Sequence, residues 1–574
     1  MKIHPGLAGW FPILQWGPTY DRQALARDGV AALIVTLMLV PQSLAYAALA
    51  GLPPQAGLYA SIAPLVLYAV FGSSRVLAVG PVAVVSLMTA DVIRQQAALA
   101  PIDPATLAVT LAFLSGVLLL AMGALRLGFL ASFLSHPVIA GFITASALLI
   151  SVGQLPVMVG LPAGGTHFFG QLTHLVTHLP QAHALTAALG LGTLAALFWA
   201  RRGLRPALVR CGLGLKAADI AARAAPVVVI AAAAALTAGL HGPDQGVGVV
   251  GQVPSGAPPL SWPSWDLSLW AQLALPAFLI SLVGFVESVS VGQTLAARRR
   301  QRIEPDRELV ALGASNVGAA LTGGFPVTGG FARSVVNFDA GAQTPAAGVF
   351  TALGILAVTL WLTPALHFVP KAALAATIVV AVMSLVDLNA FRHTWAYSRA
   401  DFTAMAATVG MTLVQGVEAG LVTGVALSLG LFVYRTSRPH IAEVGQVPGT
   451  EHFRNVQRHA VHTHDHLLGL RMDESLYFAN ARALEDRINA EVARRPALAH
   501  VVLQCSAIND IDASALESLE AIDARLREAG ITLHLSEVKG PVMDRLRDTA
   551  FLRQLRGQVF LTHHQAVQAL APAV

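Results

Sequence analysis

Two short stretches, AVGPVAVVSLM at residues 78–88 and GGFPVTGGFARS at residues 323–334, decide the fold of this chain. Each opens an apolar segment that is short for a membrane crossing and that begins with clustered glycine and proline. Such paired segments, at matching positions in the two halves of a chain, are the best sequence pointer to the binding site of a secondary transporter. They begin about 248 residues apart, close to the offset of about 242 between the first and eighth apolar runs.

The composition around these stretches is that of a membrane protein. Of 574 residues, 55% are hydrophobic and only 12% are charged, whereas soluble proteins carry about 25% charged residues. Residues 1–438 hold 38 charged side chains (23 basic, 15 acidic), and residues 439–574 hold 31 (14 basic, 17 acidic). We therefore expect a long membrane domain and a short water-soluble one. The basic residues flank the membrane, so we do not expect a nucleic-acid partner.

The apolar runs predict an all-α polytopic membrane domain of fourteen spans, two of them short. A segment at residues 166–180 is amphipathic and is expected at the membrane interface. The predicted spans begin near Gly29, Gly57, Pro81, Ala105, Phe129, Ala184, Ala222, Ala271, Leu309, Thr328, Ala346, Lys371, Phe402 and Gly416.

Basic residues gather after the sixth, eighth, twelfth and fourteenth predicted spans, and Arg94, after the third, is an exception. These four spans are even-numbered, so they all end on the same side of the membrane. The positive-inside rule therefore places both termini and the soluble domain in the cytoplasm. The proline-interrupted N-terminus predicts no cleavable signal peptide. With seven spans in each half, the two halves must be inverted relative to each other.

In such a repeat, the two short spans place helix starts at membrane depth, where their unpaired N–H groups need a protein cavity. Two opposed helix N-termini form a positive, donor-rich pocket that suits an anion. The alternative is that the glycines only allow helices to pack closely.

Ionisable residues inside spans mark transport pathways by default. Glu287 follows sixteen uncharged residues and precedes ten more, so it is a candidate carrier of a coupling proton or sodium ion. The alternative is a carboxylate near the helix end, solvated from the cytoplasm. Arg333 starts the second short span, where its guanidinium would add donors and positive charge to the pocket, or would extend to the interface as a snorkelling side chain.

Gln42 and Tyr46 lie four residues apart beside Pro41, on one face of the first span. They could donate hydrogen bonds to the same ligand, or they could join neighbouring helices. Glu418 opens the last span and is interpreted as an end-capping carboxylate without a transport role.

The soluble part alternates short strands and helices, which predicts a small α/β domain at residues 466–574 after a linker at residues 439–465. The expected strands lie at 466–472, 475–478, 500–505, 531–536 and 558–562, and the expected helices at 481–493, 513–528 and 542–549. The histidine-rich run at 459–466 fits a solvated linker better than a metal site, because it lacks ligand spacing. Neither a disulfide, a cofactor nor enzymatic activity is expected.

Several motifs resemble one family. VPQSLAYAALAGLPPQAGLYAS (residues 40–61), FVESVSVGQTLA (285–296) and GGFPVTGGFARSVVNFDAGAQTP (323–345) resemble the sulfate permease (SulP) family, whose animal members are the solute carrier 26 anion transporters. DESLYFANARALEDRI (473–488) and INDIDASALESLEAI (508–522) resemble their cytoplasmic STAS domain. Related domains carry a phosphorylatable serine directly after the motif aspartate, but here Ala513 follows Asp512, so a phosphorylation switch at this point is not expected.

The resemblance implies a transmembrane anion-transport domain at residues 1–438, with core and gate subdomains, an elevator-like movement and a homodimer. It implies coupling through Glu287, and a glutamate there favours a proton over sodium. It also implies substrate contacts between the two short spans, at Gln42, Tyr46, Pro81, Val82, Phe331, Ala332 and Arg333.

The predicted function is secondary active transport of a small anion such as sulfate, bicarbonate or a dicarboxylate, in the bacterial inner membrane. Two alternatives remain. The first is a nucleobase symporter of the same architecture, which the arginine disfavours. The second is a membrane-anchored scaffold whose STAS domain recruits a cytoplasmic protein.

Overall fold

The computed structural model of the chain describes residues 11–99, 102–132, 135–165 and 167–571, and it divides into two compact units, Met1–Ser428 and Leu429–Val574. The predicted cytoplasmic N-terminus (residues 1–10), the first residue of the predicted interfacial segment (166) and the last three residues of the predicted soluble domain (572–574) lie outside the described residues.

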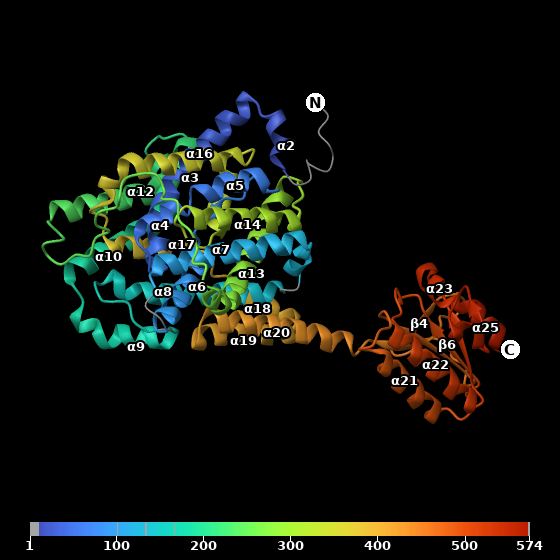
Figure 1. Cartoon of the computed structure of the whole chain (residues 1–574). Helices are drawn as coiled ribbons and strands as arrows, with labels where there is room; N and C mark the ends of the chain where they lie inside the picture. Colours follow the sequence, from blue (N-terminus) through green and yellow to red (C-terminus); the bar gives the residue numbers. More distant parts are fainter. Residues whose placement is uncertain (1–10, 100–101, 133–134, 166, 572–574) are drawn as a thin grey trace. The chain divides into compact units, whose positions relative to one another are not determined.

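The first unit is built from helices (Figure 1). In the described ranges, ten helical segments are long and apolar enough to cross a bilayer. They are Arg22–Leu49, Pro54–Phe71, Pro104–Ala124, His136–Met158, Ala184–Arg210, Ala221–Gly239, Leu267–Arg298, Ala346–Leu366, Lys371–Tyr397 and Val417–Thr436. The chain is therefore a helical polytopic membrane protein.

Four other helices coincide with predicted spans but are shorter than any of these ten segments. They have 15, 17, 9 and 17 residues and are α6 (Ala83–Ala97), α14 (Pro305–Leu321), α15 (Phe331–Asp339) and α19 (Arg399–Gln415). The two segments that the sequence predicts to be short, α6 and α15, are thus the two shortest of the predicted spans outside the ten. The segment expected at the membrane interface contains an 11-residue helix, α9 (Phe168–His178).

Two strands of two residues each bring the starts of α6 and α15 together. β1 (Val79–Gly80) and β2 (Thr328–Gly329) pair antiparallel, with Val79 opposite Gly329. α6 follows β1 and α15 follows β2 after a few residues, so the two helices begin at one place from strands of opposite direction.

Side chains of neighbouring helices satisfy the irregular backbone around this strand pair. Asn316 on α14 both donates to the carbonyl oxygen and accepts from the N–H of Val327, at 2.9 Å each. Ser288 on α13 (Leu267–Arg298) accepts a 2.8 Å hydrogen bond from the N–H of Gly329. An unsatisfied backbone group at membrane depth costs several kcal/mol, so these polar residues stabilise a non-helical segment there.

Two buried carboxyl groups hold loops of the first unit in place. Glu308 on α14, which is 0% exposed, accepts hydrogen bonds from the Tyr68 hydroxyl (2.8 Å), the Ser73 N–H (3.0 Å) and hydroxyl (2.6 Å), and the Ser74 N–H (3.1 Å). Asp28 on α3 (Arg22–Leu49) is also 0% exposed and accepts from the loop before α16 (Ala346–Ala357). Both carboxyl groups are saturated with donors, which explains how each is tolerated inside the protein.

The second unit contains a six-stranded sheet in the order β4-β3-β5-β6-β7-β8. β5 to β8 run parallel, and β3 pairs antiparallel with both β4 and β5. The strands are β3 (Ile441–Gln446), β4 (Phe453–Asn455), β5 (Leu467–Met472), β6 (His500–Gln504), β7 (Thr532–Ser536) and β8 (Val559–Phe560), and the helices are α21 (Ala481–Arg494), α22 (Ala513–Glu528), α23 (Gly540–Leu546), α24 (Ala550–Gln554) and α25 (His563–Leu570).

The structure differs from the sequence prediction at two places in this unit. Residues 439–465 are predicted as a linker, but β3 and β4 lie within this range and extend the sheet. β4 has only three residues, and Glu443, Gly445 and Gln446 interrupt the apolar residues of β3, so neither has the continuous apolar run that predicts a core strand. The strand predicted at residues 475–478 is wrong as well, because only Leu476 forms a bridge, to Ile511.

Candidate functional site

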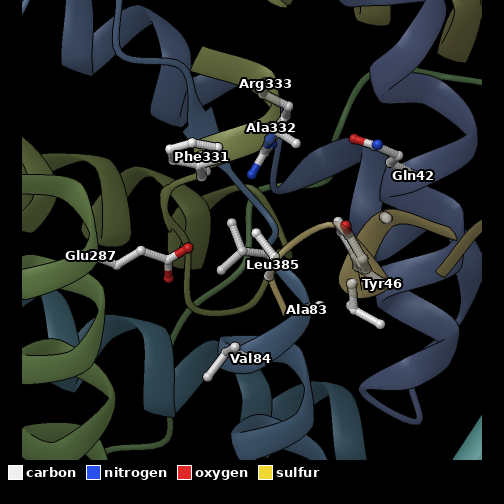
Figure 2. A pocket seen from close by; sticks show the side chains of 13 residues that line it. Gln42, Tyr46, Ala83, Val84, Glu287, Phe331, Ala332, Arg333 and Leu385 are labelled. Carbon is white, nitrogen blue, oxygen red and sulfur yellow. The ribbon is translucent and has the colours of Figure 1, made fainter. Parts of the chain in front are cut away.

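A cavity lies at the starts of α6 and α15 (Figure 2). Side chains of α3, α13 and α17 (Lys371–Met383) complete its wall. The lining residues are Gln42, Tyr46, Val82, Ala83, Val84, Glu287, Gly330, Phe331, Ala332, Arg333, Ala381, Val382 and Leu385. Seven of the eight residues predicted for substrate and cation binding line this one cavity.

Arg333 provides the buried positive charge of the cavity. Its side chain is 2% exposed, so it does not have the solvated head group of a snorkelling arginine. One guanidinium nitrogen, Nη2, donates to the carbonyl oxygen of Pro81, and the other, Nη1, is buried and has no hydrogen-bond partner among the described residues. A buried N–H donor without a partner is costly, so this nitrogen is a ready contact for a ligand.

Gly80 on β1 and Gly330, the residue after β2, leave the space that the guanidinium occupies. A Cβ atom on Gly330 would lie 2.9 Å from Nε of Arg333, and a Cβ atom on Gly80 would collide with Nη1. The glycines at these positions therefore do more than let helices approach each other, because they make room for the charged group.

The two helix starts add backbone donors to the same cavity. Neither α6 nor α15 has a side-chain cap at its N-terminus. The first turn of a helix leaves N–H groups without intrahelical partners, and the helix dipole makes this end positive. Val82 to Val84 and Gly330 to Arg333, which surround these starts, line the cavity. The arrangement suits a small anion.

Glu287 faces Arg333 across the cavity. Its carboxyl group points into the space from α13, and Arg333 reaches into it from α15 (Figure 2). Glu287 also lines a separate, largely apolar space of about 390 Å³ together with Val283, Val286 and Phe142. Its carboxyl group is therefore set between an anion-attracting pocket and an apolar wall, and it is the one acidic side chain that lines the pocket in the described structure.

Gln42 and Tyr46 form the side of the cavity opposite Glu287. Both lie on α3, Gln42 directly after Pro41 and Tyr46 one turn later, and they are 9% and 7% exposed. Figure 2 shows the two side chains on the same side of the pocket. Their spacing of four residues places them on one face of the helix, as the sequence predicts.

Pro81 and the α17 residues show where sequence reasoning was incomplete. Pro81 does not line the cavity, and its role is to accept the hydrogen bond from Arg333 with its carbonyl oxygen. Ala381, Val382 and Leu385, at the end of α17, form a wall that the sequence did not reveal. These residues are apolar members of an apolar span, so no local signal distinguishes them from residues that face lipid.

The fold and the site together define a membrane transport protein for anions, because a polytopic helical domain encloses a buried arginine between two helix N-termini. The chain belongs to the sulfate permease family, whose family model matches residues 25–408. The STAS domain model matches residues 458–566. These matches confirm the family resemblance, and the chain is a transporter of this family and not an enzyme.

Several known proteins are similar along nearly the whole chain. The probable sulfate transporter 4.2 of Arabidopsis thaliana is 34% identical over 579 residues, which cover 97% of this chain and 83% of that protein. A probable sulfate transporter of Mycobacterium tuberculosis is 34% identical over 570 residues, covering 98% of each chain.

Solved structures share the fold at lower identity. The murine solute carrier 26 family member A9 anion transporter, in the inward-facing state, superposes with a TM-score of 0.87 at 23% identity and covers 99% of this chain and 95% of its own. The transmembrane domain of a cyanobacterium bicarbonate transporter has a TM-score of 0.61 at 21% identity, covering 71% of this chain and 98% of its own.

Proposed function

We propose that this protein is a secondary active transporter of sulfate or a similar small oxyanion, and that it moves the anion together with a proton. The observation that carries the proposal is the unpaired Nη1 of buried Arg333, which lies in a cavity that also contains Glu287. The names of the similar plant and mycobacterial proteins support sulfate as the first substrate to test.

The charges of the cavity provide a mechanism for coupling. When Glu287 is ionised, its negative charge offsets the positive charge of Arg333, and an anion gains little free energy from entering the pocket. Once Glu287 binds a proton, the pocket carries a net positive charge and attracts the anion, which in turn favours the bound proton. Proton and anion binding therefore assist each other reciprocally.

The paired helix starts support seven-plus-seven inverted halves, fourteen spans and an elevator-like movement. β1 and β2 run in opposite directions and precede the two short helices, as an inverted repeat requires. In this proposal α3, α6, α13 and α15 carry the site in the core subdomain, and α17 belongs to the gate against which the core moves. The site residues are those named above, with Gln42, Tyr46, Val82, Phe331, Ala332 and Arg333 toward the anion and Glu287 toward the proton.

We further propose an inner-membrane homodimer with both termini in the cytoplasm. The positive-inside pattern supports this orientation. The STAS domain, at about residues 439–574 once β3 and β4 are included, would then present its surface to cytoplasmic proteins.

Uptake of radiolabelled sulfate into proteoliposomes tests the coupling. An inward proton gradient should accelerate uptake, and a protonophore should abolish the acceleration. Unlabelled bicarbonate, a dicarboxylate and uracil serve as competitors, and competition by uracil alone would favour a nucleobase carrier. Uptake that is equal with and without the gradient would contradict proton symport.

The Glu287→Gln variant separates binding from coupling. Glutamine resembles the protonated carboxyl group, so we expect sulfate binding to persist while the response to the gradient disappears. Glu418→Gln is the matched control, because Glu418 lies in the first turn of α20 (Val417–Thr436) and is not among the residues that line the pocket. An unchanged gradient response in Glu287→Gln would assign the coupling to another group.

A further inference from the structure

A second cavity of about 900 Å³ adjoins the first. The two cavities share Gln42, Ala332 and Ala381, so they are separated only by the side chains that line both. The second cavity contains two arginines, Arg201 and Arg223, that do not line the first. Arg201 lies after α10 (Ala184–Trp199), and Arg223 lies on α12 (Leu215–Gly239).

The other polar groups of this cavity cannot donate to a ligand while they keep their present hydrogen bonds. The Thr377 hydroxyl donates to the Ala373 carbonyl, and the Ser384 hydroxyl donates to the Ala381 carbonyl. Each hydroxyl has a single proton to donate. The donors that remain for an anion are the two arginines and the shared Gln42 amide.

Among the residues that the structure describes, both arginines have N–H groups without an acceptor. Arg201 uses Nη1 for a 3.2 Å hydrogen bond to the carbonyl oxygen of Val380, and a guanidinium has five N–H groups in total. Arg223 lies 3.8 Å from the carboxylate of Asp339, too far for a hydrogen bond. Asp339 is the last residue of α15, whose first turn carries Arg333.

We propose that the second cavity is an anion-binding station, in which Arg201 and Arg223 hold the substrate anion on its way between Arg333 and the cytoplasm. The carboxylate of Asp339 competes with the anion for the guanidinium of Arg223. An incoming oxyanion accepts a direct hydrogen bond from this guanidinium and displaces the more distant carboxylate. Gln42, which lines both cavities, contacts the anion as it passes between them. The station serves the transport proposed above and rests on it.

The chain offers a matched control for this station. Arg202 neighbours Arg201 in the same short helical turn, and both are exposed, but Arg202 does not line the second cavity. In sulfate uptake into inside-out vesicles, where sulfate enters from the cytoplasmic side, Arg201→Ala and Arg223→Ala should raise KM by about threefold to tenfold with little change in maximal rate. Arg202→Ala should stay within about twofold of the wild type, because a remote exposed charge contributes little.

Asp339→Asn should change the KM for sulfate in the opposite direction. Removing the competing carboxylate should lower KM, whereas a purely structural ion pair would leave KM unchanged or raise it. If Arg223→Ala folds poorly, Arg223→Lys replaces it in the test. Lysine keeps the charge, so this variant should keep part of the affinity. Added inert salt should weaken the wild type more than the Arg201→Ala/Arg223→Ala double variant, since exposed charges are screened.

The outcomes separate this inference from the transport proposal. If the wild type takes up sulfate and Arg333→Ala does not, but Arg201→Ala and Arg223→Ala match the wild type, the station is wrong and the transport proposal stands. An equal loss in Arg202→Ala would also overturn the station, as it would indicate a general surface-charge effect. If wild-type protein neither takes up sulfate nor gains thermal stability from it, both proposals fall.

Discussion

Arg333 donates a hydrogen bond from Nη2 to the carbonyl oxygen of Pro81, a residue 252 positions earlier in the chain. The bond joins the start of α15 to the loop two residues before α6. It fixes the guanidinium between the two helix starts, with Nη1 buried beside Gly80. The positive charge is thus positioned by the half of the protein that does not supply it.

Replacing Arg333 should remove the principal anion contact. We expect Arg333→Ala to raise the sulfate KM by about tenfold to a hundredfold, which corresponds to losing one charge-assisted hydrogen bond of about 1.5–3 kcal/mol. Arg333→Lys should be intermediate, because lysine keeps the charge but cannot bond Pro81 and a ligand with the same planar fork. Uptake kinetics measure both, and unchanged affinity in Arg333→Ala would remove this residue from the binding site.

A methyl group on Gly80 should displace the guanidinium without removing it. In Gly80→Ala the added Cβ atom would collide with Nη1 of Arg333, so we expect reduced sulfate affinity in a protein that still folds. Gly341→Ala is the control, because Gly341 also has a positive φ (95°, against 157° at Gly80) and a Cβ atom there meets nothing within 4 Å. Equal sulfate affinities in the two variants would show that the guanidinium does not need this space.

Glu308 should contribute to stability and not to transport. The carboxyl oxygens of Glu308 accept hydrogen bonds from Tyr68, Ser73 and Ser74. In a glutamine, an NH₂ group replaces one of these oxygens, so a donor would face a donor. We expect Glu308→Gln to lose about 1–3 kcal/mol and Tyr68→Phe to lose less, since it removes one bond. Thermal unfolding in detergent measures the difference, and a Tm equal to the wild type would refute this role.

The STAS domain should lose stability in acid through buried histidines. Burial, with a smaller contribution from His500, lowers the pKa of His534 to about 4, and burial lowers that of His563 to about 4. His534 accepts the Gln558 N–H at Nδ1, at 3.0 Å, so a proton on Nδ1 would break this bond. An unfolded histidine has a pKa near 6.5. Stability is therefore complete above about pH 6.5 and falls as the pH decreases toward 4.

Hydrogen exchange of the amide groups in β7 and β8 tests this prediction in the full chain. Protection, corrected for the intrinsic pH dependence of exchange, should decrease between about pH 6.5 and 4. His534→Gln should flatten the decrease, because glutamine does not titrate. Protection that is the same at both ends of this range would contradict the prediction.

The sequence located most of the candidate site because its signals are local. A proline or glycine cluster at the start of a short apolar run, and a charged residue inside a span, can each be recognised within about a dozen residues. Arg333 and Glu287 were found in this way, and Gln42 and Tyr46 by their spacing of four residues beside Pro41. Their meeting around one cavity follows from the repeat, which sequence offsets also indicate.

The missing parts depend on distant partners. Glu308 has the sequence signature of a first-turn carboxylate after an arginine cluster, and its burial depends on Tyr68, 240 positions away. The wall from α17 is apolar, so it resembles any lipid-facing surface. The apolar residues of β3 are interrupted and β4 has only three residues, so periodicity does not identify them. They become strands because β3 pairs with the edge of β5, and β4 then pairs with β3.

The antiparallel pair of β1 and β2 has one more consequence. It ties the beginnings of α6 and α15 to each other, so the proposed movement must carry both as one body, together with the guanidinium between them. An anion bound there keeps the same ligands from one side of the membrane to the other. The order of preference among competing anions should therefore be the same for import and for export, whatever the rates in the two directions.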